Sequence, residues 1–411
     1  MDQTSDKKTD LQETDTPDTE FLGLILKYRM LSDALLWKIL SKKGYESKEE
    51  VRRKALYLTD LGKLEEATDS EGNRIYQLTD AGIAQLREAG RDLSFSAEDL
   101  RLEPVLFSHQ LHLNDFVLDF EEAFQKVTPF RYYDLKQLPA KSPNLLPDGM
   151  IECRECFLFF EMDLGTEHAG DLEEKWGSYQ AFFKEHAPYY QKPVILLFIL
   201  SGSVYTAARR HTVAKTAFPR LGELFGRNLE IYADRPERLT GVLKTRFETL
   251  FFGNRGEEKK LLEAHKELRI LREKDSFFDA EALHRGTYEV LLTLPAGQKN
   301  PEGTETVVMD VEFWLDDRLS PLQMISRHAE YTAGTLGELP VPLLFVVPDS
   351  NHLQKELNPV DCRIGIYVYF IGLKEFQSDR WTEKIVQLKG PVGNRWIFRV
   401  KDFFQRVSAP L

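Results

Sequence analysis

The chain has 411 residues, enough for two or three domains that each bury a core of their own. Its hydrophobic content of 42% and charged content of 29% are typical of a soluble globular protein. The net charge of -12 excludes nonspecific coating of nucleic acid by the whole molecule, although a local basic patch can still bind DNA.

Residues 1–20 carry mostly acidic charges and almost no apolar side chain, which predicts a disordered acidic tail and not a signal peptide. The longest apolar runs, 193–200 and 341–347, have the length of buried strands and are too short to cross a bilayer. Three cysteines in a chain of this size indicate a reducing compartment. We therefore expect a cytoplasmic protein without membrane contact.

Residues 21–92 are predicted to form a winged helix-turn-helix domain, in which three helices precede a hairpin. Ser32 is a suitable cap for the second helix, and Ser47 has the capping-box spacing to Glu50 at the start of the third. The hairpin turn is rich in turn-forming residues. The expected helices are 21–28, 33–42 and 47–60, and the expected strands are 64–67 and 74–78.

The third helix is the expected groove reader, because its first half carries the basic triplet Arg52, Arg53 and Lys54. Arg74, on the hairpin, is the expected contact to a phosphate or to the minor groove. Two alternatives stay open: the triplet is only a solvated face, or the domain binds another protein. The domain carries nearly equal numbers of acidic and basic side chains, so we favour DNA binding on the position of the triplet alone.

An acidic pair ends the apolar strand predicted for 156–163. Side chains alternate along a strand, so Glu161 and Asp163 project from the same face. Burying them is costly unless a metal ion, a proton or hydrogen-bond donors compensate. Asp148, on the neighbouring strand, is the candidate third carboxylate. Three such groups fit Mg²⁺ or Mn²⁺, as in restriction-type nucleases.

Five stretches of the chain together form a pattern of motifs: Leu78-Thr79-Asp80-Ala81-Gly82, His109-x-Leu111-x-Leu113-Asn114-Asp115, Pro147-Asp148-Gly149, Phe160 to Glu167, and Lys175-x-x-x-Tyr179. By their order and spacing, residues 20–250 resemble the replication-relaxation family of plasmids and integrative elements. The resemblance implies a winged helix, a restriction-endonuclease-like module, and a role in replication, relaxation or mobilisation of element DNA. In this family the module carries Glu-x-Asp in place of the nuclease Glu-x-Lys motif, as Glu161 and Asp163 do here. One departure from the family is Leu164, where the family usually has Arg, so this loop is expected to lack a phosphate or carboxylate contact.

Strands and helices alternate through residues 105–250, which predicts an α/β (mixed α+β) module there. Residues 256–275 are charged and carry one apolar stripe, which predicts a linker helix. Residues 276–411 are then expected to form a second, degenerate α/β module. Its acidic pair is Asp310 and Glu312, and the spacing from Glu312 to Tyr331 resembles that from Glu161 to Tyr179.

Two functions fit the acidic strand. A metal-dependent endonuclease or nickase would hold Mg²⁺ or Mn²⁺ with Asp148, Glu161 and Asp163, while Lys175 orients water or stabilises the developing charge. A binding module would keep the fold without a cofactor, and its carboxylates would accept hydrogen bonds from loop amides or pair with Lys175 and Arg154. Because Asp163 puts a negative charge beside the scissile phosphate, we favour the second interpretation.

We therefore expect a DNA-binding accessory protein of a mobile element that is not an enzyme and needs no cofactor. Its expected partners are double-stranded DNA and a relaxase or replication protein of the same element. The sequence does not predict the oligomeric state.

Overall fold

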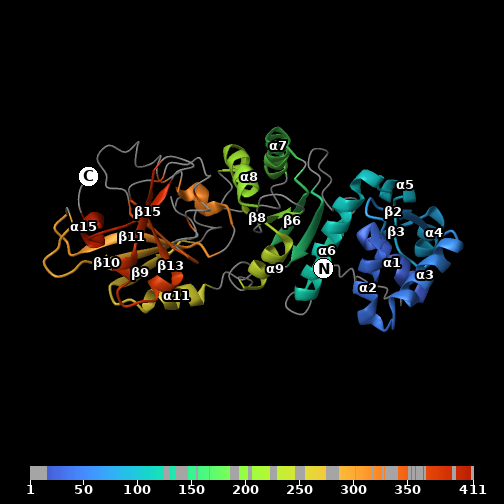
Figure 1. Cartoon of the computed structure of the whole chain (residues 1–411), viewed down its shortest axis with the longest axis horizontal. Coiled ribbons are helices and arrows are strands. Elements are labelled where there is room, and N and C mark those ends of the chain that lie inside the picture. Colours follow the sequence, from blue (N-terminus) through green and yellow to red (C-terminus); the bar gives the residue numbers. More distant parts are fainter. Residues whose placement is uncertain are drawn as a thin grey trace, which may run out of the picture. The chain divides into compact units, whose positions relative to one another are not determined.

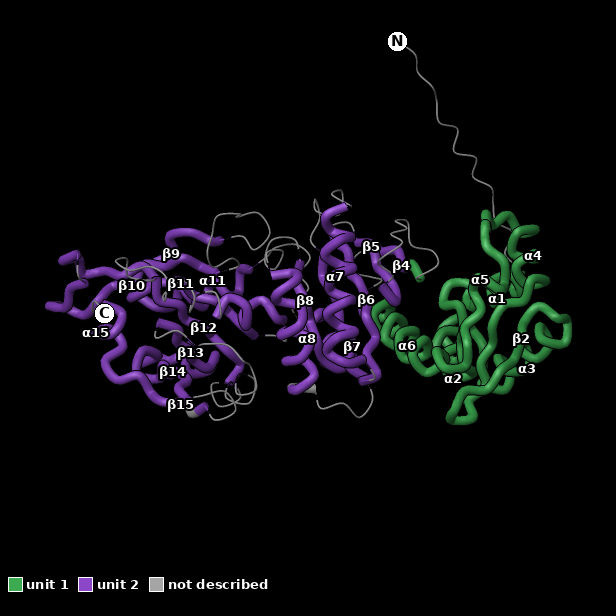
Figure 2. The backbone as a smooth tube through the Cα atoms, turned by 90° about the horizontal axis from the view of Figure 1, so that it is seen from above, with its two compact units in different colours: residues 1–122, 133–139 green, residues 123–132, 140–411 purple. Residues whose placement is uncertain are grey.

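The computed structural model describes residues 16–124, 129–134, 147–153, 156–165, 167–185, 194–201, 206–222, 229–245, 255–274, 287–300, 302–315, 318–325, 328, 341–349, 353, 357, 364, 367–390 and 395–408. The fold is mixed α/β, with three sheets in these ranges (Figure 1). The chain divides into two compact units, residues 1–122 with 133–139 and residues 123–132 with 140–411 (Figure 2). No helix in the described ranges is both long and apolar enough to cross a membrane.

The first unit contains a three-stranded antiparallel sheet in which β3 lies between β1 and β2. The predicted caps are confirmed, because the Ser32 hydroxyl accepts from the N–H of Leu35 and the Ser47 hydroxyl accepts from that of Glu50. The capping box is only half formed, since the Glu50 carboxylate accepts from the N–H of Glu46 instead of Ser47. The elements are α1 (Pro17–Tyr28), β1 (Met30–Ser32), α2 (Asp33–Leu40), α3 (Lys48–Asp60), β2 (Leu64–Thr68), β3 (Arg74–Leu78), α4 (Asp80–Glu88) and α5 (Ala97–Leu100).

The β2–β3 hairpin is fastened at its base. The N–H of Thr79 donates to the carbonyl of Lys63 at 3.2 Å, and the Thr79 hydroxyl donates to the carbonyl of Gly62 at 2.6 Å. Gly82, in the first turn of α4, approaches so closely that a Cβ would lie 2.4 Å from the Lys63 oxygen. At the tip, the Asp69 carboxylate accepts two backbone N–H groups of the turn. Both ends of the hairpin are therefore held by local hydrogen bonds.

Helix α6 (Phe107–Phe124) falls mainly in the first unit, whereas the sequence interpretation assigned residues 105–250 to the nuclease-like module. Asn114 is fully buried, and its side-chain amide donates to the carbonyls of Tyr28 and Met30 at 3.1 and 2.7 Å. These bonds fix α6 to the chain between α1 and β1. The helix periodicity of α6 was visible in the sequence, but its partner was not.

A five-stranded sheet follows in the order β4-β5-β6-β7-β8, of which the strands from β5 to β8 belong to the second unit. Strands β5 and β6 are antiparallel, whereas β6, β7 and β8 run parallel. Helices α7 and α8 lie side by side over one face of this sheet, and α9 lies on the other (Figure 1). The elements are β4 (Phe130–Asp134), β5 (Gly149–Cys153), β6 (Phe157–Asp163), α7 (Ala169–Glu185), β7 (Val194–Leu200), α8 (Thr206–Leu221), β8 (Leu229–Asp234) and α9 (Pro236–Thr245).

A seven-stranded sheet follows in the order β15-β14-β13-β12-β11-β10-β9. Strand β10 is antiparallel to β11, and β11, β12 and β13 run parallel. The elements are α11 (Gly256–Glu263), β9 (Leu268–Glu273), β10 (Tyr288–Thr293), β11 (Thr306–Phe313), β12 (Leu343–Val347), β13 (Val368–Gly372), α14 (Leu373–Phe376), β14 (Val386–Lys389), β15 (Trp396–Arg399) and α15 (Phe403–Ser408).

The linker helix predicted for residues 256–275 is wrong in its second half. Helix α11 ends at Glu263, and β9 is a strand that pairs with β10. The apolar stripe that suggested a helix includes Leu268, which in the structure is buried opposite Leu292 of β10. Long-range strand pairing therefore overrides the local periodicity.

The two sheets of the second unit share strand order and direction from β5 to β8 and from β10 to β13. Their registers also correspond: Glu161 on β6 lies opposite Phe198 on β7, and Glu312 on β11 lies opposite Phe345 on β12. A duplicated module would produce this match, and we keep the duplication as a hypothesis. Tyr331, which motivated it, lies outside the described residues.

Candidate functional site

Glu161 is buried near the end of β6 with both carboxylate oxygens occupied. Its exposed fraction is 2%. Lys175 on α7 donates from Nζ to Oε2 at 2.8 Å, and Tyr179 donates from its hydroxyl to Oε1 at 2.5 Å. The two donors are four residues apart on α7, so the helix directs both toward the same carboxylate. An internal cation and a hydroxyl therefore hold Glu161.

Asp163 has a different set of partners. Arg209 on α8 donates from Nε to Oδ2 at 2.5 Å, and the N–H of Gly165 donates to Oδ1 at 2.8 Å. Glu167 joins this group to the first, because its carboxylate lies 2.8 Å from Lys175 Nζ and its carbonyl accepts from Arg209 Nη1 at 2.8 Å. The charged side chains of β6, α7 and α8 thus form one continuous network.

Asp148 lies at the start of β5, beside this network. Its Oδ2 accepts from the N–H of Met162 at 2.7 Å, and its own N–H donates to the carbonyl of Phe160 at 3.0 Å. Met162 directly follows Glu161, so this bond places Asp148 beside Glu161, and the Asp148 charge raises the pKa of Glu161. The structure therefore brings Asp148 and Glu161 together.

The environment shifts the pKa of three side chains in this site. Burial raises the pKa of Glu161 to about 7, a shift that Lys175 opposes and Asp148 reinforces. Burial alone would lower the pKa of Lys175, but Glu161, Glu167 and Asp148 raise it above its ordinary value. Burial and the Glu161 charge raise the pKa of Tyr179, so its phenol keeps the proton that it donates.

Four acids face two cations in this site. We call Asp148, Glu161, Asp163 and Glu167, with Lys175 and Arg209, the carboxylate cluster. Two negative charges are unbalanced when all four acids are ionised. Even so, the described residues contain no group of three or more His, Cys, Asp or Glu side chains arranged to hold a metal ion. A cation bound to Oε2 of Glu161 would have to displace the Lys175 ammonium.

The exposed face of α3 carries the candidate DNA contacts. Arg52 and Arg53 are exposed, and neither forms a hydrogen bond or ion pair with another described residue. The helix buries its opposite face through Val51, Ala55 and Leu58. The two guanidinium groups are therefore available to an external anion.

The other two candidate DNA contacts are already paired within the first unit. Lys54 forms an ion pair with Asp18 at the start of α1, and its ammonium lies 5.2 Å from the ring centroid of Tyr57. Arg74 lies 3.1 Å from a carboxylate oxygen of Glu66 on the neighbouring strand. A phosphate would have to compete with these carboxylates.

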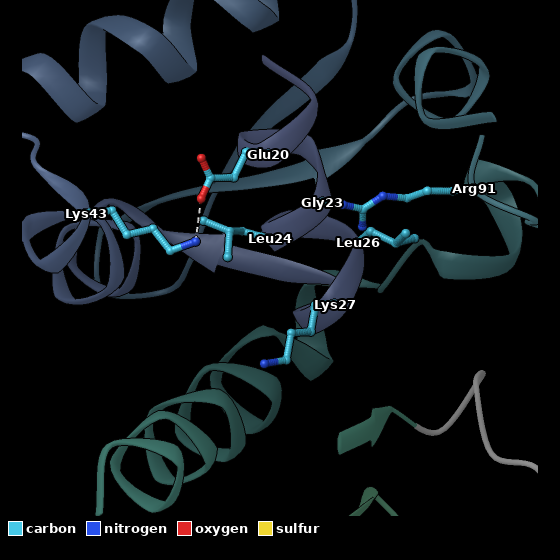
Figure 3. A pocket seen from close by; sticks show the side chains of 7 residues that line it. All are labelled: Glu20, Gly23, Leu24, Leu26, Lys27, Lys43 and Arg91. Atoms are coloured by element: carbon cyan, nitrogen blue, oxygen red, sulfur yellow. Dashed lines mark hydrogen bonds and ion pairs between the residues drawn. The ribbon is translucent and has the colours of Figure 1, made fainter. Parts of the chain in front are cut away.

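A separate pocket of about 420 Å³ opens beside α1 in the first unit (Figure 3). Lys43 donates to Glu20 at 2.5 Å, and the Arg91 guanidinium packs on Gly23, where a Cβ would lie 2.8 Å from it. The pocket is basic in composition, but part of its charge is satisfied internally. Its lining residues are Glu20, Gly23, Leu24, Leu26, Lys27, Lys43 and Arg91.

Residues 22–195 match the family model described as Replication-relaxation. This part of the chain is therefore similar to the replication-relaxation family. The resemblance expected from the sequence is thus confirmed over a segment that runs from α1 into β7. No curated protein and no solved structure was found to match the chain.

The replication-relaxation segment contains Glu161, Asp163 and Lys175, but it ends before Arg209. Sequence reasoning missed Arg209 as the partner of Asp163, since they lie 46 residues apart and no local pattern joins them. The one related signal was Leu164, where the family usually has Arg, because its loss pointed to a missing contact in this loop but not to Arg209.

Beyond the replication-relaxation segment, the seven-stranded sheet has its own buried acidic pair on β11. Asp310 accepts from Lys274 at 2.7 and 2.9 Å, and Glu312 accepts from Arg318 at 2.5 Å. Both acids are 1% exposed. Each acid on β11 therefore has a cationic partner from outside the strand, as Glu161 and Asp163 do on β6.

Proposed function

We propose that this replication-relaxation protein is a DNA-binding accessory protein of a plasmid or integrative element. Its role is in replication, in relaxation or mobilisation of the element, or in their regulation. In this proposal the first unit is a winged helix-turn-helix domain that reads double-stranded DNA. The α/β module that follows has a restriction-endonuclease-like fold and positions DNA, or a relaxase or replication protein of the same element, without cleaving DNA.

The contact between Lys175 and Glu161 carries the non-catalytic part of the proposal. A nuclease of this type needs its Glu as a metal ligand and a cation close to the scissile phosphate. Here the ammonium lies 2.8 Å from Oε2 of Glu161, and Asp163 is held by Arg209. The positive charges that could stabilise a phosphate are therefore already paired with internal carboxylates.

The DNA-binding part rests on Arg52 and Arg53. An exposed cation without a carboxylate partner gains more from a phosphate or a guanine edge than one that must first leave an ion pair. Lys54 and Arg74 are paired, so we assign them secondary roles in DNA binding. A winged helix that binds only protein is the alternative, and such a domain would not need the unpaired Arg52 and Arg53.

Incubation of supercoiled plasmid with the protein and Mn²⁺, followed by agarose electrophoresis, tests the proposal. We expect supercoiled DNA to stay intact while a gel shift detects binding to duplex DNA. Nicking that disappears in Glu161→Gln would make the protein a metal-dependent nickase. Absence of any duplex binding would favour the protein-binding alternative.

The nickase remains the second candidate function, because the carboxylate cluster has unbalanced negative charge. Two cations face four acids, and the pKa of Glu161 near 7 shows how strongly burial disfavours its ionised form. To hold Mg²⁺ or Mn²⁺, Asp148, Glu161 and Asp163 would have to move together and release Lys175 and Arg209, because the described residues do not present them as a formed metal site. The competition between a metal ion and Lys175 is measurable, as described below.

A further inference from the structure

Tyr57 lies on the exposed face of α3, one helical turn after Arg53. Its side chain is 50% exposed, which makes it one of few large apolar side chains on the surface of the described residues. Positions four apart share a face of a helix, so Arg53 and Tyr57 present a cation and an aromatic ring in the same direction. The ring also has a defined neighbour, since Lys54 Nζ lies 5.2 Å from its centroid.

We propose that Tyr57 reads thymine in the major groove, by packing its ring against the C5-methyl group. This inference rests on the proposed DNA-binding function and names a base for one residue of α3. Arginine side chains contact guanine edges and phosphates, but they do not recognise the thymine methyl, which is read by apolar groups. Tyr57 is the large apolar side chain that α3 exposes beside Arg52 and Arg53.

Charge complementarity selects duplex DNA as the occupant of this face. Arg52 and Arg53 have no carboxylate partner among the described residues, and an apolar protein surface would leave both guanidinium groups desolvated. A DNA groove supplies phosphates for the cations and methyl groups for the ring. The ordinary interpretation, an isolated exposed Tyr without a role, gives a different outcome in the experiment below.

The experiment first selects duplexes from a random pool with the full-length protein, and then measures affinity by gel shift. Tyr57→Ala should weaken binding to the selected duplex about fivefold to tenfold, whereas Tyr57→Phe, which keeps the ring, should change it by less than about twofold. Replacing single thymines by deoxyuridine removes only the methyl group. At one position the replacement should weaken wild-type binding and leave Tyr57→Ala unaffected.

Leu106→Ala is the matched control, because Leu106 is 45% exposed in the same unit and lies outside α3. It should bind like the wild type, and all variants should keep the wild-type melting temperature. If Tyr57→Phe and Tyr57→Ala lose the same affinity, the hydroxyl and not the ring makes the contact, and the inference is overturned. It is also overturned if no deoxyuridine replacement changes the affinity of the wild type. Failure to select any sequence would instead refute the proposed DNA-reading function.

Discussion

The ammonium of Lys175 lies 2.8 Å from Oε2 of Glu161, although the two residues are 14 positions apart and on different elements. Glu161 is 2% exposed and the Lys175 side chain 22%, so the pair is shielded from bulk water. In such surroundings the removal of one partner leaves an uncompensated charge, which costs far more than the intact pair contributes. The first prediction follows from this asymmetry.

At pH 8, where Glu161 is ionised in the wild type, replacement of Lys175 by Met should destabilise the second unit by about 3 kcal/mol, because Glu161 must then stay charged without its cation or take up a proton. Glu161→Gln should cost less, and the double variant should be more stable than Lys175→Met alone. Urea unfolding of the four proteins measures this coupling. Additive losses would mean that the two side chains do not stabilise one another.

Glu161 should also make stability depend on pH. The pKa of Glu161 is raised from 4.5 to about 7 in the folded protein, so the protonated form is favoured by folding. Its contribution to the free energy of unfolding is therefore complete below pH 4.5 and is lost as pH rises through 7. Between these limits the wild type should lose about 3 kcal/mol relative to Glu161→Gln. Paired urea titrations at pH 4.5 and 7.5 check the difference. Parallel pH profiles for the two proteins would show that Glu161 ionises normally.

Divalent cations should barely change the melting temperature, since Lys175 already occupies Oε2 of Glu161. Differential scanning fluorimetry with increasing Mn²⁺ or Mg²⁺ is the measurement. A metal that bound only the folded protein would raise the temperature by mass action. A clear rise that is lost in Asp163→Asn, together with nicking of supercoiled DNA, would establish the nuclease alternative.

Removal of the two unpaired arginines, Arg52→Ala with Arg53→Ala, should weaken duplex binding at least about tenfold at moderate salt. The plot of log affinity against log salt should become shallower by about one to two, because fewer counterions are released. The matched control is Lys259→Ala with Lys260→Ala on α11, which removes the same charge from another exposed helix. If the two double variants weaken binding equally, DNA binding depends on the net charge of the protein and not on the position of Arg52 and Arg53.

The duplication hypothesis predicts that Arg318 serves Glu312 as Lys175 serves Glu161. Arg318→Met should therefore destabilise the second unit, and Glu312→Gln in the same chain should restore part of the loss. Urea unfolding again provides the comparison. An experimental structure in which β10 to β13 do not superpose on β5 to β8 would contradict the duplication.

The sequence predicted elements whose signal is local. The continuous apolar run of β7 and the alternation ending β6 were sufficient to place those strands, because burial dictates both patterns. Strand β1 was not predicted, since three residues are too few to show a period. The error at β9 and the missed contact between Asp163 and Arg209 have one cause: both depend on partners distant in sequence.

The fastening of the β2–β3 hairpin also has a practical consequence. Thr79 bonds the base to the segment that follows α3 and Gly82 packs closely against it, while among the described residues the tip from Asp69 to Asn73 is hydrogen-bonded within its own turn. If the proposed DNA binding is correct, a fluorophore on a cysteine introduced at Ser70 would report on the approach of DNA to the tip, at a position outside the contacts that hold the base of the hairpin. The same position should tolerate a short peptide insertion, which makes it a suitable attachment point for single-molecule experiments that follow the hairpin.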